Sequence, residues 1–166
     1  NFSKFEVNAL MYQFDRGSHK NTESGPISLN PIHAAQLSQA VEFAVENFGA
    51  PAEWLSDYYG NLIKRGELHG LWKSAELVAT GESRRRGQYQ TDYADVGMIV
   101  AKSERGKGLG TQILRQLVDL NQDNGLQSIC STEKSNLAAQ KAISRAGFHA
   151  SNRIVRFHAE PSSVEG

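Results

Sequence analysis

Cysteine is nearly absent from this chain: Cys130 is the single one among 166 residues. A disulfide needs two cysteines, and a lone cysteine in an apolar run is typical of a buried thiol in a reducing compartment. Long hydrophobic runs are absent too, because no stretch approaches the roughly 18 apolar residues of a membrane-spanning helix, and no signal peptide is visible. We therefore expect a cytoplasmic protein with no membrane partner.

Net charge is also lacking, since 18 Lys and Arg residues balance 18 Asp and Glu residues. Proteins that bind nucleic acid usually carry an excess of basic side chains, so we expect no nucleic-acid partner. Zinc-ligand spacing is absent among the five histidines, which are His19, His33, His69, His149 and His158. The sequence therefore predicts no metal site. The length suits one domain.

The sequence does contain an apolar strand that leads through a glycine-rich loop into an amphipathic helix, between Val96 and about residue 120. Glycine occupies positions 106, 108 and 110 of the loop. The first turn of a helix offers unpaired backbone N–H groups and the positive end of the helix dipole, and glycines let the main chain approach an anion closely. This arrangement predicts a site for a diphosphate.

Two common phosphate loops do not fit this spacing. A P-loop requires G-x-x-x-x-G-K-[ST], but here Lys107 lies between glycines and Gly110 is followed by Thr111 and Gln112. The dinucleotide motif G-x-G-x-x-G requires a glycine where Thr111 stands. Both nucleotide-binding classes are excluded.

The segment Arg105-Gly-Lys-Gly-Leu-Gly110 matches R/Q-x-x-G-x-G/A, the acyl-CoA signature of the GCN5-related N-acetyltransferases (GNAT). The segment from Asn136 to Phe148 is similar to the family's N-x-x-A-x-x-x-Y-x-x-x-G-F helix and its end. The chain resembles this family specifically over residues 95–157 and more loosely over 27–94. Residues 1–26 are not covered by the resemblance.

Hydrophobic periodicity agrees with the fold that the resemblance implies. We predict strands at 4–12, 27–29, 68–73, 75–84, 93–101, 126–132 and 152–158, and helices over 34–48, 54–63, 110–125 and 136–146. Asn30 and Pro31 suggest a cap and a first helical turn. This order resembles the GNAT fold, an α/β protein with a mixed central sheet flanked by about four helices. We expect an N-terminal extension over 1–26, the GNAT domain over 27–160 and a tail over 161–166.

The resemblance implies that acetyl-CoA is the co-substrate and assigns residues to it. The main chain of the central strand would hold the pantetheine arm, through Met98, Ile99 and Val100. The loop would hold the diphosphate, through Arg105, Gly106, Lys107, Gly108, Leu109, Gly110 and Thr111. Two alternatives stay open. Arg105 and Lys107 either neutralise phosphate or are solvated, and Asn136 either caps its helix or contacts the pantetheine arm.

An amine is mostly protonated near pH 7, so transfer needs a proton acceptor. Asp95 and Glu82 are the candidate bases. Asp95 begins the central strand near the position of the base in histone-type relatives, although its spacing to Arg105 is one residue shorter, and Glu133 is a third candidate. The family's tyrosine acid is replaced by Ile143. Ser144, Tyr89, Tyr93 or water could protonate the leaving thiolate instead.

The sequence thus predicts an N-acetyltransferase that moves acetyl to a primary amine of a small molecule or peptide in a ternary complex. The alternative, suggested by Ile143, is a non-catalytic acyl-CoA sensor. Alternation along a strand predicts that Arg84 and Arg86 point one way and Arg85 the other. These arginines are either a solvated hairpin or recognise a carboxylate or phosphate. The strand within 1–26 could extend a sheet across a homodimer or dock on a further domain.

Overall fold

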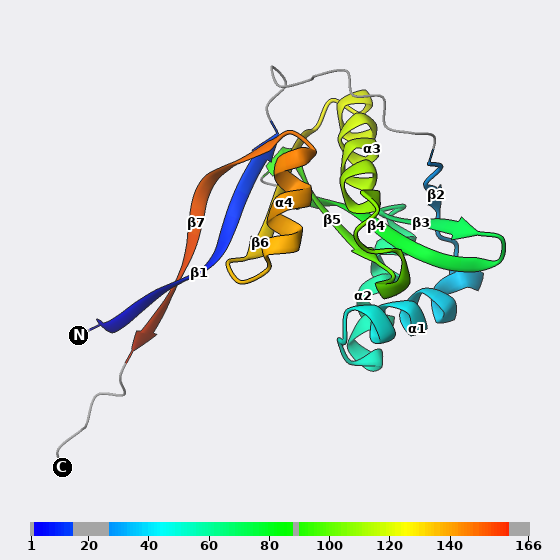
Figure 1. The fold of residues 1–166 in the computed structure, drawn as a ribbon, viewed down its shortest axis with the longest axis horizontal. Helices are drawn as coiled ribbons and strands as arrows, with labels where there is room; N and C mark the ends of the chain where they lie inside the picture. The colour runs from blue at the N-terminus through cyan, green and yellow to red at the C-terminus, as the bar shows by residue number, and fades with distance from the viewer. Residues whose placement is uncertain (1, 15–26, 88–89, 160–166) are drawn as a thin grey trace, which may run out of the picture.

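The computed structural model describes residues 2–14, 27–87 and 90–159, which form one mixed sheet with helices on both faces (Figure 1). The strands are β1 (Phe2–Phe14), β2 (Asn30–Pro31), β3 (Leu68–Lys73), β4 (Glu76–Arg86), β5 (Gln90–Val100), β6 (Gln127–Glu133) and β7 (Phe148–Ala159). The helices are α1 (Leu37–Asn47), α2 (Ala52–Lys64), α3 (Leu109–Asp123) and α4 (Leu137–Arg145). The seven strands lie in the order β2-β3-β4-β5-β6-β1-β7. The predicted α/β mixed-sheet class is confirmed.

Two apolar clusters hold the layers together, one on each face of the sheet. Helices α3 and α4 cover one face, and α1 and α2 lie across the other (Figure 1). The sequence predicts an amphipathic helix here, and the apolar side chains on the buried face of α3 are at most 1% exposed, namely Ile113, Leu114, Leu117 and Val118. Each such side chain contributes about 1.5–3 kcal/mol by leaving water. Their burial fixes α3, and hence the loop before it, against β4 and β5.

Strands β5 and β6 are parallel neighbours over only three residue pairs, which end at Asp95 opposite Ile129. Beyond this point β5 continues with β4 on its other side, from Val96 to Val100, and β6 continues with β1. The two strands therefore separate, and the β5 main chain that faces the gap has no strand partner on that side. Such a gap can accept an extended ligand.

Strand β1 lies inside the sheet, antiparallel to both of its neighbours. Its residues Ala9–Gln13 pair with β6, and its whole length pairs with β7. The predicted strand at 4–12 is thus present, and its partners are strands of its own chain. The division of the chain at residue 26 and the homodimer stay predictions, and residues 15–26 and 160–166 lie outside the described part.

Two neighbouring local predictions are wrong. Residues 27–29 are not a strand, and Asn30 and Pro31 do not begin a helix, because they pair with Gly70 and His69 as the short edge strand β2. A proline is tolerated on an edge strand, where its missing N–H costs no ladder bond. The helix begins later, with a 3-10 turn over Ala34–Gln36 that continues into α1. The pattern of Asn30 and Pro31 resembles a helix start, and local sequence does not indicate that β3 lies beside these residues.

Candidate active site

The glycine loop opens onto a cavity of about 550 Å³ between the end of β5, the start of α3 and α4. All of the predicted cofactor-binding residues except Lys107 line it: Met98, Ile99, Val100, Arg105, Gly106, Gly108, Leu109, Gly110, Thr111 and Asn136. The main chain of β5 that faces the gap between strands therefore meets the loop in one space.

The glycines of the loop serve two different purposes. Gly106 and Gly108 have φ angles of +78° and +81°, a left-handed conformation that side chains with a Cβ adopt only with strain. At Gly110 a Cβ would lie 2.9 Å from Cε of Met98, the mobile end of that side chain, so a substitution there would displace Met98 at the wall of the cavity. Gly108 precedes α3, and no side chain caps this helix in the described structure. The first N–H groups of α3 are thus presented to the cavity.

The two basic residues of the loop are held by the protein itself. The Arg105 guanidinium donates to the carbonyl of Val100 at 3.1 Å and to the carbonyl of Asn47 at 2.8 Å. It ties the end of β5 to the end of α1. Lys107 lies 3.3 Å from Glu104, which also binds Lys73 at 2.6 Å. Hydrogen bonds from Lys73 and Lys107 lower the pKa of Glu104. The loop therefore offers main-chain donors more than free cations.

Asn136 caps α4, as one of its two interpretations predicted. Its side-chain oxygen accepts the N–H of Ala139 at 3.1 Å, and the residue also lines the cavity. An asparagine cap stabilises a helix by about 1 kcal/mol. Its contact with the pantetheine arm stays a prediction.

The two candidate bases lie beside each other where β5 and β6 separate. The β4–β5 register places Glu82 opposite Gly97 and Arg84 opposite Asp95. Tyr58 on α2 donates its hydroxyl to Glu82 at 2.9 Å, and Arg84 forms an ion pair with Asp95 at 3.2 Å. We call these four residues, Tyr58, Glu82, Arg84 and Asp95, the carboxylate cluster.

Burial and neighbouring charges set the proton affinities in this cluster. Burial is the main reason why the pKa of Glu82 is raised, and the Arg84 charge and the Tyr58 hydrogen bond oppose it only in part. Burial lowers the pKa of Arg84, but the carboxylates of Glu82 and Asp95 raise it above its usual value. The pKa of Tyr58 is raised by burial and by Glu82. Glu82 is thus a carboxylate with increased basicity.

Cys130 lies on β6 and is 4% exposed. Burial, and then the negative charge of Asp95, raises the pKa of its thiol to about 12. A thiol is a nucleophile only as the thiolate, so Cys130 is inert near pH 7.

The remaining candidates are dispersed. Ile143 lies on the buried face of α4, is 2% exposed and packs in the core, and its hydrocarbon side chain has no proton to donate. Ser144 and Glu133 are exposed, and Tyr93 is half-buried at the start of β5. Tyr89 lies outside the described residues.

Sequence reasoning missed the contacts inside the carboxylate cluster. The sequence predicts Arg84 either in a solvated hairpin or as a group that recognises anions, but in the structure it binds Asp95. Arg85 points to the other face, as alternation along the strand predicts. The side chain of Arg86 lies outside the described part. The pairing of Arg84 with Asp95 follows from the sequence if the turn between β4 and β5 is centred near residue 89, because a single register joins β4 to most of β5. Nothing local indicated the bond from Tyr58.

Within the described ranges, no three His, Cys, Asp or Glu side chains are grouped so that they could hold a metal ion. No helix in those ranges is long and apolar enough to cross a membrane.

The model of the acetyltransferase (GNAT) family matches residues 34–148 of this chain. A comparison with curated protein sequences finds no match. The match covers most of the chain and includes the loop, the cavity and the carboxylate cluster.

Solved structures agree. A GNAT-family acetyltransferase from Colwellia psychrerythraea is 50% identical with a TM-score of 0.89, over 95% of this chain and 57% of that one. A GCN5-related N-acetyltransferase from Sphaerobacter thermophilus is 15% identical with a TM-score of 0.74, over 92% of this chain and 53% of that one. This chain therefore spans little more than half the length of either relative.

A third structure is an aminoglycoside N-acetyltransferase in complex with a bisubstrate analogue of CoA and acetylneamine. It is 14% identical with a TM-score of 0.68, over 82% of this chain and all of that one, which shows a shared fold. The glycine loop at the start of α3, the strand gap beside it, the family match and the 50% identity to the Colwellia structure together place the chain in the acetyltransferase (GNAT) family.

Proposed function

We propose that this chain is an N-acetyltransferase that uses acetyl-CoA and transfers the acetyl group directly to a primary amine. The observation that carries the proposal is the continuity of β5. Gly97 faces Glu82, and the next residue, Met98, lines the cavity of the glycine loop. A thioester held along β5 from the loop would thus reach the carboxylate cluster.

The main chain provides the binding energy for the cofactor in this proposal. The loop N–H groups at the start of α3 bind the diphosphate, because they are unpaired donors at the positive end of a helix dipole. The N–H and carbonyl groups of Met98 to Val100 pair with the pantetheine amides across the strand gap. A fixed N–H there also stabilises negative charge on the thioester oxygen during attack, since it needs no reorganisation.

Glu82 is the proposed base. The amine must lose a proton before it attacks, and a carboxylate with a raised pKa accepts that proton more readily. The Tyr58 hydroxyl donates a hydrogen bond to Oε2 of Glu82, while Oε1 of Glu82 faces Gly97 of β5. Asp95 is held by Arg84, so we assign this pair to positioning and to the charge of the site. The carboxylate cluster contains two carboxylates and one guanidinium, and this excess of acidic groups favours a cationic amine.

The chemical step then balances without a covalent enzyme intermediate. Glu82 first takes one proton from the ammonium, and the free amine nitrogen then attacks the thioester carbon. As the C–S bond breaks and CoA leaves as the thiolate, the second nitrogen proton passes to water. A thiol with a pKa near 8.5 leaves without full protonation, so the step tolerates Ile143 in place of tyrosine. The inert thiol of Cys130 supports direct attack.

The acceptor is the least defined part of the proposal. The aromatic rings of Trp54 and Tyr58 stack at 4.8 Å on α2, and Trp54 is 52% exposed. Trp54 stacks on Tyr58, and Tyr58 binds Glu82, so the exposed Trp54 ring lies close to the proposed base. It offers a contact for a cationic or ring-containing amine. We propose a primary amine of a small molecule or peptide as the acceptor class.

Thiol release from acetyl-CoA in the presence of a panel of amines tests the proposal. The panel holds amino acids, polyamines, aminoglycosides and lysine peptides. We expect turnover with at least one amine, and the same turnover in Cys130→Ala. No release with any amine, together with no acetyl-CoA binding at millimolar concentration, would refute the proposal.

The second candidate, an acyl-CoA sensor without transfer activity, is favoured by the buried Ile143 alone. It predicts tight acetyl-CoA binding by calorimetry and no thiol release above the uncatalysed rate with any amine. Turnover with one amine removes it.

A further inference from the structure

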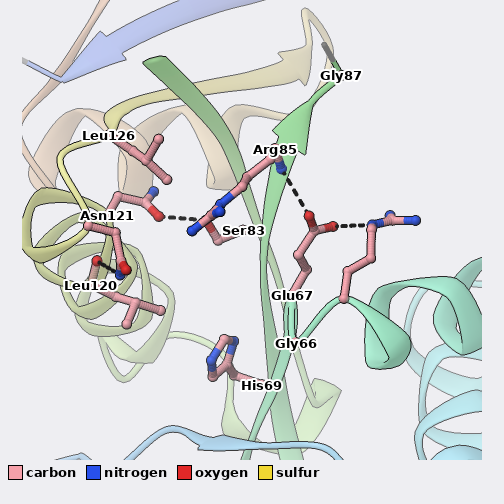
Figure 2. Close-up of a pocket in the computed structure, with 11 residues that line it drawn as sticks. Gly66, Glu67, His69, Ser83, Arg85, Gly87, Leu120, Asn121 and Leu126 are labelled. Atoms are coloured by element: carbon pink, nitrogen blue, oxygen red, sulfur yellow. Dashed lines mark hydrogen bonds and ion pairs between the residues drawn. The ribbon is translucent and has the colours of Figure 1, made fainter. Parts of the chain in front are cut away.

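A second cavity, of about 640 Å³, lies at the far end of α3 from the glycine loop (Figure 2). Its walls come from the end of α2, from β3 and β4 and from the last turn of α3. None of its lining residues lines the cavity of the glycine loop. The 15 residues of α3 separate the two by about 22 Å.

This cavity is on the opposite face of β4 from the carboxylate cluster. Side chains alternate along a strand, so Ser83 and Arg85 point away from the side of Glu82 and Arg84. Gly81 belongs to the same set as Ser83, and a Cβ on it would lie 3.0 Å from Ile113 of α3. The cavity therefore belongs to neither the proposed cofactor site nor the proposed acceptor site.

His69 supplies an unused polar atom to this cavity. It is 8% exposed, and its Nδ1 is buried without a hydrogen-bond partner among the described residues. Figure 2 shows its ring projecting from β3 toward the side of Leu120. Burial lowers the pKa of His69, so the ring is neutral near pH 7. A buried polar atom without a partner is unfavourable, and a ligand hydroxyl or amide that bonds to it would remove that cost.

Arg85 supplies an unpaired positive charge. Both oxygens of Glu67, the nearby carboxylate, are engaged: Arg65 binds one at 2.9 Å and the backbone N–H of Arg85 binds the other at 3.3 Å. The charge of Glu67 is thus matched by Arg65. The Arg85 guanidinium extends toward Ser83 and Asn121 (Figure 2) and has no carboxylate partner in the described part of the chain.

The other residues that line the cavity either have their hydrogen bonds satisfied within the protein or are apolar. Ser83 donates to Asn121 at 2.6 Å, and Asn121 donates to Ser128 at 2.9 Å, so this buried chain of hydrogen bonds needs no ligand. Leu120 and Leu126 provide an apolar surface beside it. The last turn of α3 carries the negative end of the helix dipole, which disfavours an anion with several charges.

We propose that this cavity binds a small organic acid with a single carboxylate. The carboxylate pairs with the guanidinium of Arg85, an apolar body packs against Leu120 and Leu126, and a hydroxyl or amide group of the ligand bonds to Nδ1 of His69. Arginine suits this role because its fork of donors matches a carboxylate. Inorganic phosphate lacks the apolar body and is expected to bind poorly.

Titrations followed by NMR, on the full chain, test this site with three probes: 4-methylpentanoate, its 2-hydroxy analogue and inorganic phosphate. We expect saturable binding of the two acids, tighter for the hydroxy acid, with shifts at the His69 ring and the Asn121 side-chain amide. Saturating CoA should leave these titrations unchanged.

Arg85→Gln should weaken both acids by about tenfold or more, because a charge-assisted pair is lost. Lys64→Gln is the matched control: it removes one exposed charge outside the cavity and should change nothing. His69→Phe should abolish the preference for the hydroxy acid and keep 4-methylpentanoate binding.

Four results would overturn the assignment. These are no saturable binding of either acid at millimolar concentration, equal binding by Arg85→Gln, displacement of the acids by CoA, and phosphate binding as tight as the acids. Equal affinity of the two acids for the wild-type chain would remove His69 from the site. Arg85 is exposed, so its variant folds and the test stands even where His69→Phe does not.

Discussion

The glycine loop and the carboxylate cluster lie at the two ends of the same stretch of β5, yet they are built differently. The loop presents main-chain N–H groups, and its basic side chains, Arg105 and Lys107, are engaged by the protein. The cluster presents side chains from α2, β4 and β5. Side-chain substitutions should therefore matter most in the cluster, and backbone changes should matter most in the loop.

The largest effect is expected from Glu82→Gln, which removes the proposed base and keeps the size of the side chain. Loss of a general base lowers kcat/KM by about 10²- to 10⁴-fold. Steady-state kinetics measure it, and the acetyl-CoA dissociation constant should stay unchanged. A variant that retains wild-type kcat/KM would show that Glu82 is not the base.

The second-largest effect is expected from Gly108→Ala on acetyl-CoA binding, with Gly125→Ala as the control for backbone strain. Gly108 and Gly125 have φ angles of +81° and +72°, and a Cβ on either would meet nothing within 4 Å. Alanine at either position therefore costs a similar strain of about 1–2 kcal/mol. Only Gly108→Ala should weaken acetyl-CoA binding, by about tenfold, since misdirected N–H groups lose hydrogen bonds to a charged ligand.

Calorimetric titration of both variants with acetyl-CoA makes this comparison, and thermal unfolding checks that their stabilities match. Equal affinities of Gly108→Ala and Gly125→Ala would mean that the main chain of the loop does not hold the cofactor.

A smaller effect, of about three- to tenfold in kcat/KM, is expected from Tyr58→Phe, which removes one hydrogen bond to the base. The Tyr58 hydrogen bond lowers the pKa of Glu82, so its loss raises that pKa further. Activity rises with pH as Glu82 deprotonates, and the rising limb of the kcat/KM profile should therefore move to higher pH in the variant. A limb that stays in place or moves to lower pH contradicts this arrangement.

The smallest effect is expected from Lys107→Gln. Its ammonium group is exposed, lies outside the cavity and binds Glu104, and such exposed pairs contribute about 0–1 kcal/mol. The acetyl-CoA dissociation constant should change by less than about threefold at physiological salt. A larger loss would mean that Lys107 leaves Glu104 to bind phosphate.

The loop was predictable because its chemistry is local. Glycine spacing, the apolar strand before it and the helical stripe after it are consecutive in the chain, and the structure places them in one cavity. The buried face of α3 was predictable for the same reason, since a helix repeats its own pattern. Asn30 and Pro31 show the limit, because their cap-like pattern lost to pairing with β3.

The carboxylate cluster was predictable only as a pair of candidate residues. Asp95 and Glu82 could be named from their strands, but the partners that orient them are distant: Tyr58 precedes Glu82 by 24 residues and comes from another element. His69 and Arg85 carried no signal for a shared cavity, because β3, β4 and α3 meet only in the folded sheet.

The amino-acid order by itself determined the glycine loop, the strands and helices around it and the loss of the family tyrosine at Ile143, since each depends on neighbours within a few positions. The tertiary structure alone decided that β1 lies between β6 and β7, that Arg84 binds Asp95 and that Arg105 is held by Asn47. These contacts join segments far apart in the chain. They form only when burial of the apolar faces of α1–α4 brings those segments together, a step that no local pattern encodes.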